Sequence, residues 1–170
     1  MQTSSISYFK QNQYRIHENC KHPILVAWKL RTPENYGNLL RLADNTACSL
    51  VLFVVDENKL SERKIRKTAG DSYQRVHFIF CNEANWRNFI PEEYELIAIE
   101  TYEFSENLYR EALPQSVALV VGNEKRGIEA EILEQCDKVL HIPLAGECKS
   151  LNVSHAAAIA LFEWLRQYHV

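Results

Sequence analysis

Short apolar runs alternate with more polar segments along most of the chain. Six runs stand out, at residues 24–30, 50–55, 76–80, 95–99, 117–121 and 138–142. Each has the length of a β-strand, whereas the segments between them show helix-like spacing of their apolar residues. This alternation predicts an α/β fold: a mostly parallel six-stranded sheet with helices on both faces.

The length and the polar start of the chain predict its organisation. A chain of 170 residues is long enough for one substantial core and too short for two. Residues 1–22 are polar and carry no clear period, so we expect a tail or a short helix there. Residues 23–170 contain no repeat and no linker-like tract, and we expect them to form a single domain.

Composition excludes several classes of protein. No apolar run is long enough to span a bilayer, and no secretory leader is visible, so we expect a cytoplasmic protein without membrane contact. The five cysteines never form a CxxC pair and the histidines are scattered, so neither a disulfide framework nor a metal site is expected. The net charge of −3 counts mildly against a nucleic-acid substrate.

The first motif is PENYGNLLRLA, at residues 33–43. A helix that begins near Gly37 would have a buried stripe and an outward-facing polar set. The buried stripe would be Leu39, Leu40, Ala43 and Ala47, and the outward set Asn38, Arg41 and Asn45. Arg41 would therefore be presented to solvent. By spacing alone, an ordinary solvated arginine is the favoured interpretation.

The second motif is VVGNEKRGI, at residues 120–128. It predicts a strand that ends in a glycine-bracketed turn before a helix around residues 129–135. Ligands of open α/β sheets bind at the carboxyl ends of strands, so Gly122 could form the floor of a cofactor pocket. The motif matches neither the dinucleotide fingerprint nor the P-loop, and a plain strand-to-helix turn stays open.

The third motif combines IPL at residues 142–144 with SLNVSHAAAIALFE at residues 150–163. Ser150, Asn152 and Ser154 are good capping residues. They precede a helix that is apolar nearly all round and should be buried. Simple N-capping of a core helix accounts for single serines here, although it does not require the whole SLNVS string.

In this order and at these spacings, NxGNxxRxA, VGNExxG and IPL followed by SLNVSxAAAI resemble the motifs of the SpoU/TrmH branch of the SPOUT RNA methyltransferases. The resemblance covers residues 24–165. It implies an S-adenosylmethionine-dependent RNA 2′-O-ribose methyltransferase acting on tRNA or rRNA. It also implies a single SPOUT catalytic domain at residues 23–170, a C-terminal trefoil knot, and an obligate homodimer with each active site completed at the interface.

The resemblance also assigns roles to individual residues. The cofactor contacts that it implies are Thr101, Gly122, Ile142, Leu144 and Leu151. The catalytic group that it implies is Arg41, helped by Asn35, Glu124, Ser150 and Asn152.

The role of Arg41 needs a physical adjustment. A guanidinium stays protonated in proteins, so it is a poor general base. We therefore expect Arg41 to grip the adjoining RNA phosphate bidentately and to orient it as the proton acceptor. In this hypothesis Glu124 and Asn152 hold the arginine and the ribose.

RNA binding requires local positive charge despite the acidic total. The basic residues that we expect to contact RNA are Lys59, Arg63, Lys64, Arg66, Lys67 and Arg126. For any single lysine of the 59–67 segment, a solvated helix face is an equally good interpretation.

Two departures leave alternatives open. After Arg41 the family usually has alanines, an aromatic residue and a glycine, where this chain has residues Asp44 to Ala47, which bears on packing and substrate choice. We also expect the chain to have almost nothing beyond the catalytic domain. A compact tRNA wobble-position 2′-O-methyltransferase and a non-catalytic RNA-binding protein on the same fold therefore remain alternatives, and without the resemblance so does a flavodoxin-like nucleotide binder.

Overall fold

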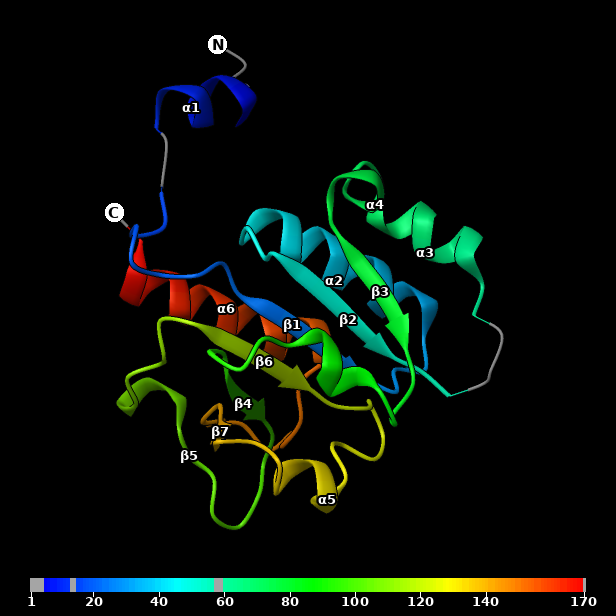
Figure 1. Ribbon diagram of the computed structural model, residues 1–170, viewed down its shortest axis with the longest axis vertical. Coiled ribbons are helices and arrows are strands. Elements are labelled where there is room, and N and C mark those ends of the chain that lie inside the picture. Colours follow the sequence, from blue (N-terminus) through cyan, green and yellow to red (C-terminus); the bar gives the residue numbers. More distant parts are fainter. Residues whose placement is uncertain (1–4, 13–14, 57–59, 170) are drawn as a thin grey trace.

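A computed structural model describes residues 5–12, 15–56 and 60–169. Within them, seven strands form one sheet in the order β3-β2-β1-β6-β4-β7-β5, and every pair of neighbouring strands is parallel (Figure 1). The strands are β1 Ile24–Trp28, β2 Leu50–Val54, β3 Phe78–Cys81, β4 Glu95–Ile99, β5 Glu106–Asn107, β6 Val117–Val121 and β7 Lys138–His141.

The expected α/β class is confirmed, but the expected count of six strands is wrong. The additional strand is β5, which has two residues and pairs with β7 at the edge of the sheet. Glu106 and Asn107 are both polar, so no apolar run marks this strand in the sequence.

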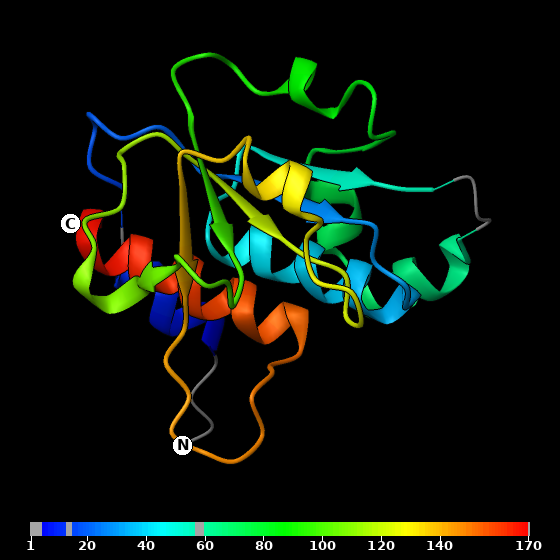
Figure 2. The same ribbon diagram turned by 90° about the horizontal axis from the view of Figure 1, so that it is seen from below.

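Helices cover both faces of the sheet, as expected. The helices are α1 Ser5–Gln11, α2 Pro33–Asn45, α3 Glu62–Ala69, α4 Ser72–Arg75, α5 Ala130–Leu133 and α6 Val153–Tyr168, with 3₁₀ turns η1 Trp86–Phe89 and η2 Leu108–Arg110. Figure 2 shows α2 and α6 beneath one face and α5 on the other. None of the helices in the described ranges is long and apolar enough to cross a membrane.

The central strands are apolar throughout because both of their faces are buried. All five residues of β1 are buried. Leu25 and Ala27 face the core beneath α2 and α6, whereas Val26 and Trp28 face the core on the side of η1 and α5. Alternate side chains of one strand thus contribute to two cores, which is typical of a parallel sheet covered on both faces.

Helix α2 begins earlier than the sequence predicted. It begins at Pro33, which suits the first turn because proline needs no hydrogen-bonded N–H there. Gly37 therefore lies inside the helix, where α2 crosses α3. A Cβ atom on Gly37 would lie 2.5 Å from Cβ of Thr68 and 2.8 Å from the carbonyl oxygen of Ile65. The glycine permits close helix packing and does not mark the start of the helix.

The outward face of α2 is as expected, and part of the inward face is not. Asn38, Arg41 and Asn45 are exposed, which confirms the predicted polar face. Ala47 is exposed instead of buried, because the helix ends at Asn45 and Ala47 adopts a left-handed conformation with φ of 52°.

Helix α6 is less buried than its apolar sequence predicts. Asn152 caps its N-terminus, accepting a hydrogen bond from the backbone N–H of Ser154 at 2.8 Å. Val153, Leu161 and Trp164 are buried against the sheet. Phe162, however, is 53% exposed, so one apolar side of the helix remains uncovered.

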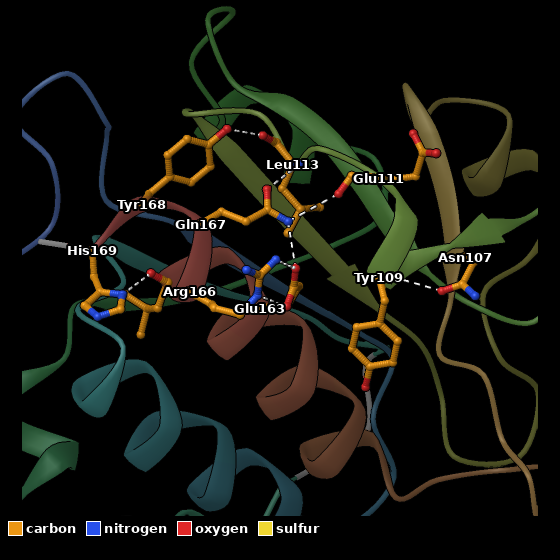
Figure 3. A network of polar contacts seen from close by, with 10 residues as sticks. Asn107, Tyr109, Glu111, Leu113, Glu163, Arg166, Gln167, Tyr168 and His169 are labelled. Carbon is orange, nitrogen blue, oxygen red and sulfur yellow. Dashed lines mark hydrogen bonds and ion pairs between the residues drawn. The ribbon is translucent and has the colours of Figure 1, made fainter.

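A polar network fixes the C-terminal end of α6 (Figure 3). The buried carboxylate of Glu163 accepts hydrogen bonds from Arg166 at 2.7 and 2.8 Å and from Gln167 at 2.8 Å. The Gln167 side chain also accepts a hydrogen bond from the Leu113 N–H at 2.9 Å and donates one to the Glu111 carbonyl at 3.2 Å. The segment before β6 and the end of α6 are thereby held together, which orients the whole helix.

Candidate functional site

Two cavities open along the edge of the sheet where the strands end. The strand order reverses between β1 and β6, and ligands of open α/β sheets bind at such a switch point. The first cavity, of about 360 Å³, lies at the ends of β4, β6 and β7. The second cavity, of about 630 Å³, lies at the ends of β1, β2 and β6.

All five residues that were expected to contact a cofactor line the first cavity. They come from four separate segments: Thr101 after β4, Gly122 after β6, Ile142 and Leu144 after β7, and Leu151 before α6. Glu124 and Ser150 line the same cavity. The structure thus brings together residues that the sequence placed up to 50 positions apart.

Gly122 is required by the turn that forms one wall of the first cavity. A Cβ atom at this position would lie 2.6 Å from the carbonyl carbon of Gly127 and 2.9 Å from the backbone nitrogen of Ile128. These are backbone atoms, so a side chain at residue 122 would force the turn open. The conformation explains why glycine follows β6 directly.

Glu100, which the sequence motifs did not single out, closes the same turn from the other side. Its carboxylate accepts hydrogen bonds from the N–H of Thr101 at 2.9 Å and of Ile128 at 3.0 Å. Glu100 lines the first cavity and fixes the end of β4 to the turn after β6. An acidic residue directly after a buried strand was the available signal in the sequence.

A chain of hydrogen bonds joins the three sequence motifs. Asn35, on the first turn of α2, is 5% exposed, and its side chain donates to the carboxylate of Glu124 at 2.7 Å. Its amide oxygen accepts from the side chain of Asn152 at 3.3 Å. Asn35 is therefore the link between the turn after β6 and the start of α6.

Glu124 also holds the segment that enters α2. Its carboxylate accepts hydrogen bonds from the backbone N–H of Arg31 at 2.9 Å and from both the N–H and the hydroxyl of Thr32, at 3.2 and 3.0 Å. Burial opposes ionisation of this carboxyl, but the donors around it outweigh burial and hold the pKa of Glu124 below its ordinary value. Glu124 is thus a structural acceptor that stays ionised at neutral pH.

The expectation that Glu124 and Asn152 hold Arg41 does not agree with these contacts. Both side chains are engaged with Asn35 and with backbone groups instead. Arg41 is exposed, lines neither cavity, and forms no hydrogen bond or ion pair with any residue in the described part of the chain. Its guanidinium group is available to a ligand or to another protein chain.

The expected RNA-binding residues lie on two surfaces. Arg63, Lys64, Arg66 and Lys67 are exposed on α3, and Arg126 lines both cavities. Within the described ranges, Lys64 is paired with Glu34 and Arg66 with Glu62, whereas Arg63 and Lys67 form no ion pair. Lys59 lies outside the described residues.

The described residues contain no group of three or more potential metal ligands. Their five cysteines are unpaired; Cys20 and Cys81 are buried and Cys148 is exposed. The first cavity is therefore lined by backbone, apolar and charged groups and not by a cluster of metal-binding side chains.

Comparison with known proteins connects this geometry to a family. The model of the SpoU rRNA methylase family matches residues 22–162. A 23S rRNA (guanosine-2′-O-)-methyltransferase, RlmB of Salmonella typhi, is 33% identical over 145 residues, which are 85% of this chain and 60% of that protein. The chain thus spans less than two thirds of the length of such curated relatives.

Two solved structures have the same fold. An AdoMet-bound rRNA methyltransferase from Sinorhizobium meliloti matches with a TM-score of 0.79 and 23% identity, over 89% of this chain and 58% of that one. A structure described as giving insight into 2-OH methylation of C/U34 on tRNA matches with a TM-score of 0.76 and 26% identity, over 86% of this chain and 95% of that one. Because the family model covers all three motifs and the strands that carry them, the chain belongs to the SpoU rRNA methylase family.

Proposed function

We propose that this protein transfers a methyl group from S-adenosylmethionine to a ribose 2′-hydroxyl of tRNA or rRNA. The observation that carries the proposal is the first cavity, where the five expected cofactor residues meet and where the lining residue Glu124 is hydrogen-bonded to Asn35 and, through it, linked to Asn152. The proposed catalytic domain is residues 23–170, and the proposed location is the cytoplasm, where both classes of RNA are found.

The residues of the first cavity fit S-adenosylmethionine. Ile142, Leu144 and Leu151 provide apolar surface for a flat ring, and the turn at Gly122 exposes backbone groups that can hydrogen-bond its edge. A volume of about 360 Å³ lies within the range of small-molecule sites. When bound, S-adenosylmethionine supplies an electrophilic methyl group on a sulfonium centre.

The polar chain beside the cavity positions the substrate but does not remove its proton. Four donors occupy the carboxylate of Glu124, and its pKa is lowered, so it is a weak general base. Asn35 and Asn152 lock the entry to α2 against the start of α6. We assign to these residues, with Ser150, the orientation of the ribose at the mouth of the cavity.

Arg41 has a separate role in this proposal. Its unpaired guanidinium can bind an RNA phosphate through two parallel hydrogen bonds, which positions that phosphate as the proton acceptor for the 2′-hydroxyl. Because Arg41 lines neither cavity of its own chain, we assign it to the site of a second copy. The active site is then completed at the interface of a homodimer.

The uncovered side of α6 is the proposed dimer surface. Phe162 is 53% exposed, and Ala158, Ile159 and Leu165 are partly exposed on the same helix. An exposed apolar strip of this kind is characteristic of protein interfaces. The family resemblance supports the same arrangement, together with a trefoil knot formed by the C-terminal half.

The basic surface of α3 is the proposed approach for RNA. Arg63 and Lys67 are its unpaired members within the described ranges, and Arg126 extends positive charge to the first cavity. Such local charge compensates for the acidic total because RNA affinity depends on the phosphates actually contacted.

A methyl-transfer assay tests the proposal. Purified protein is incubated with methyl-labelled S-adenosylmethionine and either total tRNA or total rRNA, and label in RNA is counted. We expect incorporation with one RNA class and its loss in Leu144→Arg, whose side chain would fill the cavity. Absence of label with both RNA classes, from wild-type protein that binds S-adenosylmethionine in calorimetry, contradicts catalysis and favours a non-catalytic RNA-binding protein.

A second candidate function is methylation of the tRNA wobble ribose. The observation that favours it is length: the structure described for C/U34 is matched over 95% of its chain, whereas the Salmonella rRNA enzyme is matched over 60%. Nearly the whole of the chain described for C/U34 on tRNA is thus accounted for by the fold of this chain. The tRNA arm of the assay separates this candidate from an rRNA substrate.

A further inference from the structure

The methyl-transfer proposal assigns no ligand to the second cavity. It opens at the ends of β1, β2 and β6 and, at about 630 Å³, is larger than the first. The two cavities share Asn123, Lys125 and Arg126 along their common border. A ligand in the second cavity therefore lies directly beside whatever occupies the first.

The second cavity carries unneutralised positive charge. Arg31, Lys125 and Arg126 line it, and none of their side chains forms an ion pair with a residue in the described ranges. Asp56 is its one acidic lining residue among those described. Three cations that are unpaired within the described part of the chain attract an anion strongly to one concavity, because low-dielectric walls concentrate their field.

Lys29 differs from these three cations. It bridges Glu83 at 2.7 Å and Glu129 at 3.3 Å, so its charge is already compensated. Its backbone adopts a left-handed conformation with φ of 47°, and its carbonyl oxygen accepts a hydrogen bond from the side chain of Asn123 at 2.5 Å. Lys29 therefore serves to fix the end of β1 against the turn after β6.

Hydrogen bonds fix the backbone of the turn after β6. The side-chain oxygen of Asn123 accepts hydrogen bonds from the N–H of Lys125 at 2.9 Å and of Arg126 at 3.1 Å. Both basic side chains thus start from a fixed backbone at the border of the two cavities. Preorganisation of this kind lowers the entropic cost of binding an anion.

Asp56 and the apolar lining residues of the second cavity suit the sugar and the base of a nucleotide. Asp56 lies two residues beyond β2, and an acidic residue near the end of the second strand binds ribose hydroxyls in other nucleotide-binding α/β sheets. Leu30, Pro33, Val55 and Leu60 provide apolar surface for a base. The basic residues would thus contact the phosphate of a nucleotide, Asp56 its ribose, and the apolar residues its base.

We propose that the second cavity binds a nucleotide of the RNA strand next to the one that is methylated. Arg31 and the basic border residues hold its phosphate, and Asp56 accepts a hydrogen bond from its ribose 2′-hydroxyl. The inference rests on the proposed function, because the occupant of the first cavity defines the neighbouring nucleotide. It adds a means of selecting RNA over DNA at a position that is not itself modified.

Calorimetric titrations of the full chain, with S-adenosylmethionine present, test this inference. The probes are the 5′-phosphorylated dinucleotide pUpU, its deoxy form pdUpdU, and UMP. The variants are Arg31→Ala and Asp56→Ala, at residues that do not line the first cavity, and Arg87→Ala on η1 is the charge-matched control for Arg31→Ala. Affinity for S-adenosylmethionine is measured for every variant as a check on the fold and on the first cavity.

We expect Arg31→Ala to weaken pUpU binding about tenfold, which corresponds to the loss of one charged hydrogen bond, and Arg87→Ala to leave it unchanged. Wild-type protein should prefer pUpU to pdUpdU, and Asp56→Ala, which removes the acceptor oxygens, should abolish that preference. Equal pUpU affinity in wild type and Arg31→Ala overturns the inference, as does UMP binding as tightly as pUpU. Failure of wild-type protein to bind S-adenosylmethionine would instead contradict the proposed function.

Discussion

At the scale of single residues, the site depends on polar side chains that are far apart in sequence. Asn35 lies 89 residues from Glu124 and 117 residues from Asn152, yet it is hydrogen-bonded to both. The motifs predicted which residues matter, but they did not predict these partners. Local spacing carries no information about contacts that only the tertiary fold creates, and this is why Glu124 was assigned to Arg41 instead of Asn35.

The first prediction concerns Arg41. We expect Arg41→Lys to lower kcat for methyl transfer by tenfold or more, because an ammonium group cannot replace two parallel guanidinium hydrogen bonds to a phosphate. Affinity for S-adenosylmethionine should stay unchanged, since Arg41 does not line the first cavity. Single-turnover kinetics and calorimetry measure the two quantities. Activity close to that of wild type would rule out the bidentate role.

The second prediction concerns Glu124 and pH. The folded-state pKa of Glu124 is lowered, so its ionisation stabilises the fold above its ordinary pKa of about 4.3, and this contribution is lost as the pH falls through the folded value. Glu124→Gln should therefore lower the free energy of unfolding at pH 7, by about 1 kcal/mol after allowing for partial exposure. The difference from wild type should shrink as the pH falls below about 4. Urea unfolding across pH 3 to 7 tests this, and a difference independent of pH would contradict it.

At the scale of elements, the strongly apolar strands were predictable from the sequence. A polar edge strand and the close packing of two helices were not. Each of the six predicted runs coincides with a strand to within two residues at either end, since continuous burial on both faces demands apolar residues. The short edge strand β5 has no apolar run in the sequence, because both of its residues are polar. The early start of α2 was missed because Gly37 looked like a turn residue, whereas its function is close contact with α3.

The third prediction follows from that contact. On an isolated helix, Gly37→Ala would stabilise by up to about 1 kcal/mol. Here the added Cβ atom meets Thr68 and the backbone of Ile65 at less than 3 Å, and overpacking of this kind costs about 1–3 kcal/mol. We therefore expect net destabilisation in urea unfolding. Gly146→Ala is the control, since a Cβ atom there meets nothing within 4 Å, and equal stability of the two variants would show that α2 and α3 can separate without cost.

At the scale of the whole molecule, the fold gathers both cavities at one edge of the sheet and leaves one side of α6 uncovered. The α/β class was predictable from the alternation of runs, and a parallel sheet places its ligand sites at the edge where the strands end. The second cavity was not predictable, because its lining comes from β1, β2 and β6, whose adjacency is a property of the folded sheet. The exposure of Phe162 was likewise not predictable, because it depends on how α6 packs against its neighbours in the fold.

The fourth prediction concerns assembly. Phe162→Glu should convert a homodimer to monomers at micromolar concentration and abolish methyl transfer, because a charge would replace a central apolar contact, which is typically worth 2 kcal/mol or more. Affinity of each chain for S-adenosylmethionine should be affected much less than transfer. Phe104→Glu is the matched control, because Phe104 is also exposed but lies on the loop before β5. Sedimentation velocity measures the state, and wild-type protein that sediments as a monomer would contradict the proposed interface.

The most direct test of the central claim is the chemical position of the transferred methyl group. RNA modified by the protein with S-adenosylmethionine is digested to nucleosides, and mass spectrometry then determines whether the added 14 mass units, one methyl group in place of a hydrogen, lie on the ribose or on the base. We predict a single 2′-O-methylated nucleoside that forms at least tenfold more slowly with Arg41→Lys and is absent with Leu144→Arg. Methyl groups on a base, or an RNA left unmodified by a protein that binds the cofactor, would contradict it.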